Sequence, residues 1–133
     1  MRALCQCGQL TADLPPSAPA VVACHCIYCQ RRTGSPFGVL AYYPADQVVV
    51  SGEAKRFTRP TASGARFETV FCPHCGSTLA GIASKHPGLI GIAVGAVADP
   101  HFPPPVRSVW ETSMHPWVRM PDDVQHFPEG RSS

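Results

Sequence analysis

The segment FCPHCGS, residues 71–77, places Cys72 and Cys75 three positions apart and follows them with Gly76. A C-x-x-C pair followed by glycine is typical of a zinc knuckle, in which a tight turn brings both sulfurs to one metal ion. Pro73 fixes its own φ in such a turn, and Gly76 tolerates a left-handed conformation. The segment therefore predicts one half of a zinc site.

A second cysteine pair lies near the N-terminus, where CQC places Cys5 and Cys7 two positions apart. Together the two pairs predict a closed tetrahedral site of four thiolates, which would tie the start of the chain to its middle. His74 lies inside the knuckle and is interpreted as an exposed turn residue, because four cysteines already saturate the ion. The alternatives for these four cysteines are disulfides or buried reduced thiols.

The remaining three cysteines, Cys24, Cys26 and Cys29, lie in ACHCIYCQRRTGSP, residues 23–36. Three protein ligands with one further position open are the pattern of a catalytic zinc ion. Three thiolates on Zn²⁺ leave about one net negative charge, and such a soft centre would accept another thiolate more naturally than it would activate water. These residues predict a thiol substrate held by zinc.

Two other interpretations stand beside this one. His25 or a distant histidine would close the cluster as a second structural site, or the three cysteines would hold no metal and respond to oxidation. On an extended segment, the side chain of His25 would point away from those of the cysteines on either side. Because the pKa of histidine lies near working pH, His25 is also a candidate donor of a proton to the alkoxide that forms.

Arg31 and Arg32 follow the cluster directly. Arginine pairs with carboxylates in bidentate fashion, and a thiol peptide such as glutathione carries carboxylates. The two arginines are therefore candidates for substrate binding, and the alternative is that they lie on a solvated turn. Four aromatic side chains either line the pocket or belong to the core: Phe37, Tyr42, Trp110 and Trp117.

The length of 133 residues suits one domain with one core. Fifteen prolines and eleven glycines argue against a helical protein and fit many short strands joined by turns. We expect a mainly β fold of short antiparallel strands with little helix, as a single domain over residues 1–127 with a loose tail over 128–133. A helical turn is expected over residues 26–32. Strands are expected over residues 9–15, 19–26, 37–43, 47–52, 55–59, 65–72, 77–83, 89–97 and 108–112.

The net charge of +2 is a weak argument for nucleic-acid binding. MRALCQC at the N-terminus does not have the pattern of a signal peptide, because cysteine and glutamine come before any apolar run. The longest apolar run, residues 88–97, is too short for a membrane helix. We expect a cytoplasmic protein with reduced cysteines and no membrane partner.

Four segments together resemble the glutathione-dependent formaldehyde-activating enzyme family, which also includes centromere protein V. They are CQCG, CHCIYCQRRTGSPF, FCPHCGSTL and VWETSMHPWV, and they run in the family's order from Cys5 to about Phe127. The resemblance implies a β-tent fold with two zinc ions per chain. It implies structural zinc on the first set and catalytic zinc on the second: Cys5, Cys7, Cys72 and Cys75; Cys24, Cys26 and Cys29.

The family's named reaction joins glutathione to formaldehyde, giving S-hydroxymethylglutathione, and is classed as that of a carbon–sulfur lyase in the reverse sense. The resemblance therefore implies glutathione or another small thiol, and an aldehyde, as substrates. The alternative is a non-catalytic, zinc-stabilised module that binds nucleic acid or a protein. Basic and aromatic residues interleave over the expected hairpin: Lys55, Arg56, Phe57, Arg59, Arg66 and Phe67. The small net charge predicts weak, salt-sensitive binding, so nucleic acid is not the expected partner.

Overall fold

The protein folds into two β-sheets and a few short helices, as described over residues 1–130 by a computed structural model. The smaller sheet is antiparallel, in the order β1-β2-β5. Its strands are β1 (Arg2–Leu4), β2 (Thr11–Asp13) and β5 (Val49–Ser51). The expectation of a mainly β fold with little helix is confirmed.

The larger sheet has eight strands in the order β11-β10-β3-β4-β9-β8-β7-β6. They are β3 (Ala20–Cys24), β4 (Gly38–Pro44), β6 (Lys55–Pro60), β7 (Arg66–Phe71), β8 (Thr78–Ala83), β9 (Leu89–Ala93), β10 (Arg107–Val109) and β11 (Gln125–His126). The expected hairpin is formed by β6 and β7.

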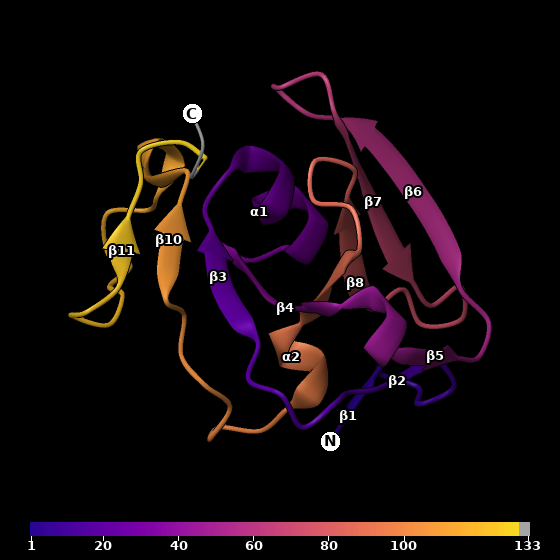
Figure 1. Ribbon diagram of the computed structural model, residues 1–133. Coiled ribbons are helices and arrows are strands. Elements are labelled where there is room, and N and C mark those ends of the chain that lie inside the picture. Colours follow the sequence, from indigo (N-terminus) through magenta and orange to yellow (C-terminus); the bar gives the residue numbers. More distant parts are fainter. Residues whose placement is uncertain (131–133) are drawn as a thin grey trace.

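The pairing departs from a purely antiparallel sheet at β10, which runs parallel to both β3 and β11. Parallel neighbours need a crossover, because a tight turn can only reverse the chain. The proline-rich stretch over residues 99–106 forms the last part of this crossover, and it carries the chain from the short helix that follows β9 back to the edge of β3. Figure 1 shows this long connection below β10.

The two faces of the larger sheet have different surroundings, because side chains alternate along each strand. One row across five paired strands faces the core and is buried: Val21, Ala41, Ile92, Ala80 and Val70. On the core side, Ala3, Leu10 and Ala12 from the smaller sheet and the loop next to it complete the cluster. The opposite face of β3 and β4 carries Val22, Leu40 and Tyr42, which line a cavity.

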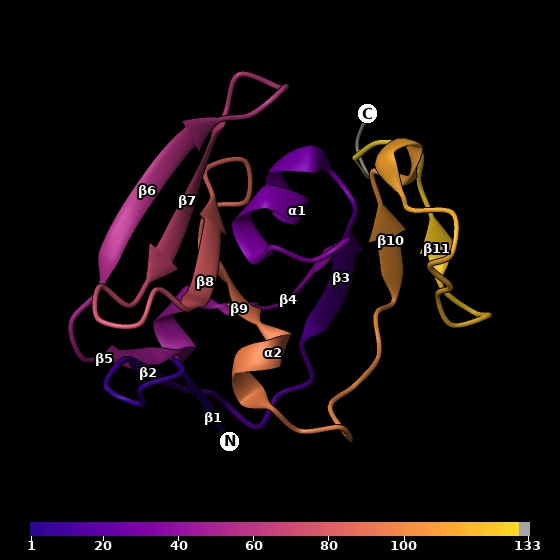
Figure 2. The ribbon, with the colours of Figure 1, turned by 180° about the vertical axis from the view of Figure 1, so that it is seen from behind.

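Helix α1 (Ile27–Thr33) forms where the sequence predicts a helical turn. Gly34 ends it in a left-handed conformation, with φ 68°, and donates its N–H to the carbonyl of Gln30. In Figures 1 and 2, α1 lies between β3 on one side and the β6–β7 hairpin on the other. The helix that carries part of the three-cysteine segment thus lies against the sheet with Cys29 buried and most of its other side chains exposed.

Two expected strands end early. The strand predicted over residues 89–97 stops at Ala93 and continues as α2 (Val94–Val97). An apolar run of this length does not distinguish a strand from a helix, and the helical turn packs Val94, Ala96 and Val97 against the core. The strand predicted over residues 108–112 stops at Val109, because Trp110 adopts φ 58° and the chain turns into the 3-10 helix η2 (Glu111–Ser113).

The C-terminal part of the chain is held by backbone hydrogen bonds. Trp110 donates its N–H to the carbonyl of Glu129 at 3.1 Å, and Thr112 donates to that of Pro128 at 3.2 Å. The expected loose tail over 128–133 is therefore anchored at its first residues, and 131–133 lie outside the described residues. A second 3-10 helix, η1 (Ala45–Gln47), joins β4 to β5. Over residues 1–130, the helices are too short to cross a membrane.

Candidate functional site

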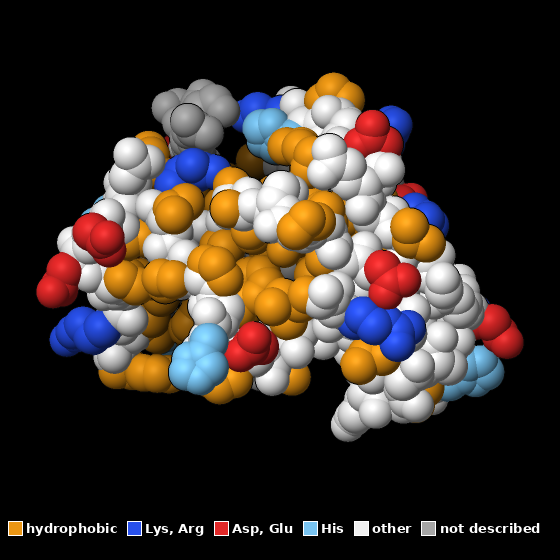
Figure 3. All heavy atoms as spheres, turned by 60° about the horizontal axis from the view of Figure 1, so that its bottom comes forward, with side chains coloured by type: hydrophobic (Ala, Val, Ile, Leu, Met, Phe, Trp, Pro, Cys, Tyr) orange, Lys and Arg blue, Asp and Glu red, His pale blue; other side chains and the backbone are white. Residues whose placement is uncertain are grey.

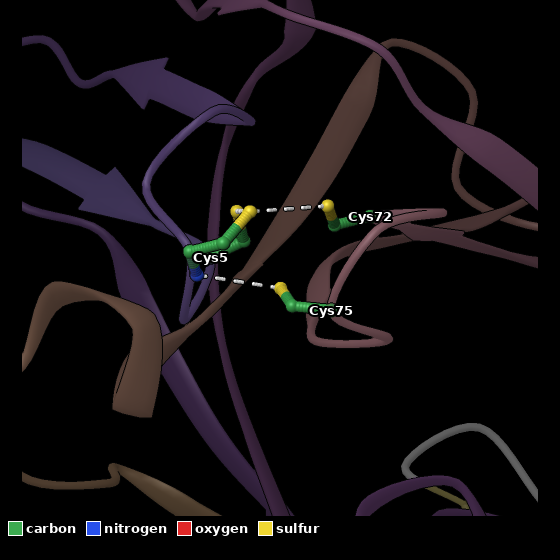
Figure 4. Close-up of side chains that lie close together, drawn as sticks. Cys5, Cys72 and Cys75 are labelled. Carbon is green, nitrogen blue, oxygen red and sulfur yellow. Dashed lines mark hydrogen bonds between the residues drawn. The ribbon is translucent and has the colours of Figure 1, made fainter.

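The two distant cysteine pairs predicted from the sequence meet in one cluster. The sulfurs of Cys5, Cys7, Cys72 and Cys75 all lie within 4.8 Å of one another. The Cys7 sulfur lies 3.6 Å from that of Cys5 and 3.8 Å from that of Cys72, so the thiols are close but not bonded. Figure 4 shows Cys5, at the end of β1, facing Cys72 and Cys75 on the turn between β7 and β8.

Both halves of this cluster are built as glycine turns. Gly8 donates its N–H to the carbonyl of Cys5 at 3.0 Å, and Gly76 donates to that of Cys72 at 2.9 Å. Their φ values of 85° and 77° lie in the left-handed region, where a residue with a Cβ would be strained. The two turns present their sulfurs to the same point, which is the geometry of a closed four-sulfur metal site.

Hydrogen-bond donors surround the four sulfurs. The backbone N–H of Leu10 lies 3.3 Å from the Cys5 sulfur, and that of Cys7 lies 3.4 Å from the Cys75 sulfur. The Ser77 hydroxyl, with backbone donors behind it, lowers the pKa of Cys75 to about 5. Hydrogen bonds also lower the pKa of Cys72, whereas the pKa of Cys7 is raised to about 11, so Cys72 and Cys75 are the thiols most readily converted to thiolates, the form in which cysteine binds a metal. His74 points elsewhere, with Nε2 at 3.2 Å from a carboxylate oxygen of Glu53.

The three remaining cysteines form a second cluster, with sulfurs within 4.8 Å of one another. Cys24 ends β3, Cys26 precedes α1 and Cys29 lies inside the helix. The Cys29 N–H donates to the Cys26 sulfur at 3.3 Å. Hydrogen bonds from the thiols of Cys24 and Cys29 lower the pKa of Cys26 to about 2, and the same interactions raise the pKa of Cys24. The three thiols are thus close enough to share protons, with Cys26 favoured as the thiolate.

The surroundings of this second cluster also fit a metal ion held by thiolates. Nε and Nη2 of Arg32 are buried and have no hydrogen-bond partner among the described residues. Its guanidinium occupies the space above Gly38, where an added Cβ would lie 2.5 Å from Nη2. An unpaired buried cation is costly unless an anion lies near it, and three thiolates around a divalent ion supply a net negative charge. Each of the two clusters can hold one metal ion.

A cavity of about 450 Å³ opens beside the three-cysteine cluster. All three cysteines line it, together with Arg32 from α1, Arg59 from β6 and Trp110. It adjoins a second cavity of about 490 Å³, and Tyr42, Trp110 and several other residues line both. A cluster with an open side therefore faces a space large enough for a small molecule.

Tyr42 lies in the wall shared by the two cavities. Its ring lies over Gly91 on the neighbouring strand, where an added Cβ would come 3.0 Å from Cε1. Burial, with the nearby thiols of Cys24 and Cys29, raises the pKa of Tyr42 to about 12. The phenol therefore stays protonated at neutral pH and is available as a hydrogen-bond donor toward the cavity.

His25 is fully buried and does not line the cavity. Its Nε2 shares a hydrogen bond of 2.9 Å with the hydroxyl of Ser108, and its ring centre lies 5.2 Å from that of Phe37. Burial lowers the pKa of His25. Nδ1 has no hydrogen-bond partner among the described residues. The ring is thus turned away from the cluster into the interior, as alternation along an extended segment predicts.

Of the other residues singled out from the sequence, some line the cavity and others do not. Arg31 is exposed and does not line the cavity, whereas Arg32 does. Of the four aromatic residues considered as walls, Tyr42 and Trp110 line it. Phe37 packs on His25, and Trp117 is 68% exposed.

The basic residues of the β6–β7 hairpin do not form one common face. Arg56 is paired with Glu68 on the neighbouring strand, and Arg59 is turned into the cavity, where Phe67 is buried. Figure 3 shows the face at the bottom of Figure 1, where Lys and Arg side chains lie apart from one another around hydrophobic ones. The basic residues of the hairpin are thus divided between its two faces.

Sequence reasoning missed two contributors to the cavity: Tyr28 and the inward direction of Arg59. The alternation of β6 fixes which residues share a face with Arg59, but not which face meets the cavity. Gly91 does not line the cavity, but its lack of a side chain leaves room for the ring of Tyr42, which does.

Comparison with known proteins agrees with this picture. The chain shares 21% sequence identity with a Rhodobacter sphaeroides protein of known crystal structure, with a TM-score of 0.57 over 72% of this chain and 86% of that one. At that identity the likeness concerns the fold alone. No curated protein matches the chain. The family model described as glutathione-dependent formaldehyde-activating enzyme matches residues 1–113, which include all seven cysteines. The chain therefore belongs to the glutathione-dependent formaldehyde-activating enzyme family.

Proposed function

We propose that this protein is a zinc-dependent enzyme that adds a small thiol to an aldehyde, forming a carbon–sulfur bond. The observation that carries the proposal is the three-sulfur cluster in the wall of a cavity. Family membership supports glutathione and formaldehyde as the first pair of substrates to test. In the reverse direction the activity is that of a carbon–sulfur lyase.

The two clusters would hold one zinc ion each. Cys5, Cys7, Cys72 and Cys75 form a closed set of four ligands, which suits a structural ion. Cys24, Cys26 and Cys29 would hold the second ion. That ion would keep one position for the substrate sulfur and lower the pKa of the substrate thiol. The free thiols of all seven cysteines support placing the protein in the reducing cytoplasm.

Arg32 would stabilise negative charge at the reacting sulfur. Its guanidinium is buried beside the cluster and its Nε and Nη2 have no hydrogen-bond partner among residues 1–130. A fixed cation in a region of low dielectric stabilises an anion more strongly than one in water does. We assign this electrostatic role to Arg32 and none to Arg31, which is exposed and turned away from the cavity.

Tyr42 would donate the proton that the aldehyde oxygen takes up. The sulfur lone pair forms the new bond to the aldehyde carbon, the π electrons of the carbonyl move to oxygen, and that oxygen takes the phenolic proton of Tyr42. Water returns to the tyrosinate the proton that the thiol released, so the net reaction adds S–H across C=O. His25 is buried and bonded to Ser108, so we assign it to holding the backbone between two ligands rather than to proton transfer.

The proposal is tested by zinc content together with an exchange measurement. Thiols add to formaldehyde without a catalyst, so the useful quantity is the rate of exchange between free glutathione and its adduct at equilibrium, measured by NMR with and without protein. We expect near two zinc ions per chain and faster exchange for the wild type. Cys26→Ser should retain near one zinc ion and return exchange to the uncatalysed rate. Wild-type protein that carries two zinc ions but leaves the exchange rate unchanged with every small thiol tested would refute the proposal.

A further inference from the structure

Arg59 is held between two aromatic rings at the edge of the cavity. The central carbon of its guanidinium lies 4.4 Å from the ring centre of Tyr28 and 5.0 Å from that of Phe67. Tyr28 belongs to α1 and directly precedes Cys29, whereas Phe67 lies opposite Arg59 in the β6–β7 register. The guanidinium therefore bridges the cluster helix and the hairpin.

Stacking leaves the hydrogen-bonding edge of this guanidinium largely unused. Rings contact the face of the group, while its N–H donors point outward in its plane. Its recorded hydrogen bond is from Nη1 to the carbonyl of Pro60 at 3.4 Å, which is at the long end of the range. The carboxylate nearest along the hairpin, Glu68, is paired with Arg56 instead. Among residues 1–130, no ion pair is formed by Arg59.

The sheet beneath these groups is shaped to hold them in place. An added Cβ at Gly81 would lie 2.3 Å from Cζ of Phe67, so the ring fits only because that residue is glycine. Gly81 pairs with Gly91, over which the Tyr42 ring lies. Phe67 is buried and fixed, and it in turn fixes the position of Arg59.

Apart from the cysteines, the charged side chains that line the cavity are basic. None of the described lining residues is acidic. Besides the cysteines, the charged or titratable residues that line the cavity are Arg32, Arg59, His86, Tyr28 and Tyr42. The adjoining cavity adds Arg66, Lys85 and Arg107 against one carboxylate, that of Glu129. A fixed cation with free donors, facing a space without protein carboxylates, is the arrangement that binds an anionic ligand.

We propose that Arg59 binds a carboxylate of the thiol substrate, so that the site selects thiols carrying a carboxylate over neutral thiols. This inference rests on the proposed thiol–aldehyde reaction and names the class of thiol that it uses. The sulfur would lie at the three-cysteine cluster and the carboxylate at Arg59, with both ends in the same cavity of about 450 Å³.

The test compares two thiols that differ only in charge, 3-mercaptopropionate and 3-mercaptopropionamide. KM and kcat for formaldehyde exchange are measured for both, and their binding to the zinc-loaded protein is measured by titration calorimetry. The wild type should prefer the carboxylate about tenfold or more in KM and in Kd, the size expected for one charge-assisted hydrogen-bonded pair. A wild type without this preference would overturn the inference and leave the reaction itself intact.

Variants locate the preference on Arg59. Arg59→Met keeps an apolar chain between the two rings and should remove most of the preference, by weakening binding of the carboxylate alone. Arg59→Lys should restore part of it. Arg56→Met removes the same charge from the same strand, on the face away from the cavity. It should leave KM and Kd unchanged for both thiols.

The remaining outcomes separate the two proposals. If Arg59→Met binds both thiols more weakly by the same factor and has a lower Tm, Arg59 only holds α1 and the hairpin together. If the wild type binds the carboxylated thiol tightly through Arg59 but does not accelerate exchange, the binding inference stands and the proposed reaction fails. If Arg59→Met does not fold, the wild-type preference and its partial retention in Arg59→Lys decide.

Discussion

The two cysteine clusters use the same ligand atom but are built in opposite ways. The four-cysteine cluster joins two turns that are far apart in the chain, since Cys7 and Cys72 are 65 positions apart. The three-cysteine cluster comes from a single stretch of β3 and α1. Closing a long loop constrains the unfolded chain more than closing a short one. We therefore propose that a metal ion in the first cluster would contribute mainly to stability, and one in the second mainly to chemistry.

Their surroundings differ in the same sense. Backbone N–H groups of two glycine turns point at the sulfurs of the first cluster. The second cluster has on one side Nε and Nη2 of Arg32, which are buried and have no hydrogen-bond partner among residues 1–130, and a cavity on the other. Four ligands with fixed donors around them leave no coordination position for a substrate, whereas three ligands beside an open space leave one. The number of ligands and the sequence separation together distinguish a structural site from a reactive one.

The largest effect that would test this comparison is expected for Cys72→Ser. Losing this ligand should release the ion that ties β1 to the middle of the chain and cost several kcal/mol, out of a total stability of roughly 5–15 kcal/mol. We expect a fall in Tm of about 10 °C or more, measured by circular dichroism with zinc content determined on the same sample.

Cys26→Ser is the matched control for that measurement, because it removes one thiol from the short-range cluster. Its Tm should fall by less than half as much as that of Cys72→Ser. If the two substitutions lower Tm equally, the division into a structural and a reactive cluster is wrong.

The next effect concerns the reactive region alone. Tyr42→Phe removes one hydroxyl from the cavity wall and should lower kcat for thiol–formaldehyde exchange by about 100-fold, the usual contribution of a positioned acid. Zinc content and Tm should stay close to those of the wild type. Tyr43→Phe, on the core face of the same strand, should keep full activity. Unchanged kcat in Tyr42→Phe would exclude the phenol as the proton donor.

The smallest effect is expected for Gly91→Ala. The added methyl group would lie 3.0 Å from the Tyr42 ring and 3.2 Å from Leu40, so the ring must move by a few tenths of an ångström. We expect a cost of about 1 kcal/mol in stability, measured by denaturant unfolding, and a few-fold loss of kcat. Gly95→Ala, where an added Cβ meets nothing within 4 Å, should leave kcat unchanged and should not lower stability, because alanine is the better helix former in α2. A Gly91→Ala variant with wild-type kcat would show that the ring position is not critical.

Much of the fold and both clusters could be predicted from local patterns. Short strand-like runs bounded by turn residues predicted β3, β4 and the β6–β7 hairpin, and C-x-x-C followed by glycine predicted the knuckle. Predictions failed where an apolar run was compatible with two structures, as in residues 94–97, and where one backbone angle ended a strand, as at Trp110. Pairing of β10 parallel to β3 depends on a long crossover that local patterns do not reveal.

The sequence by itself determined which residues can bind metal, because cysteine spacing and the glycines beside it are local properties of the chain. Only the tertiary structure decided what faces the reactive cluster. It brought Arg59 from β6 between Tyr28 and Phe67, turned Tyr42 toward the cavity over Gly91, and buried His25 against Ser108. These choices depend on which face of each strand meets which neighbour, and that is settled by packing of the whole sheet rather than by any single segment.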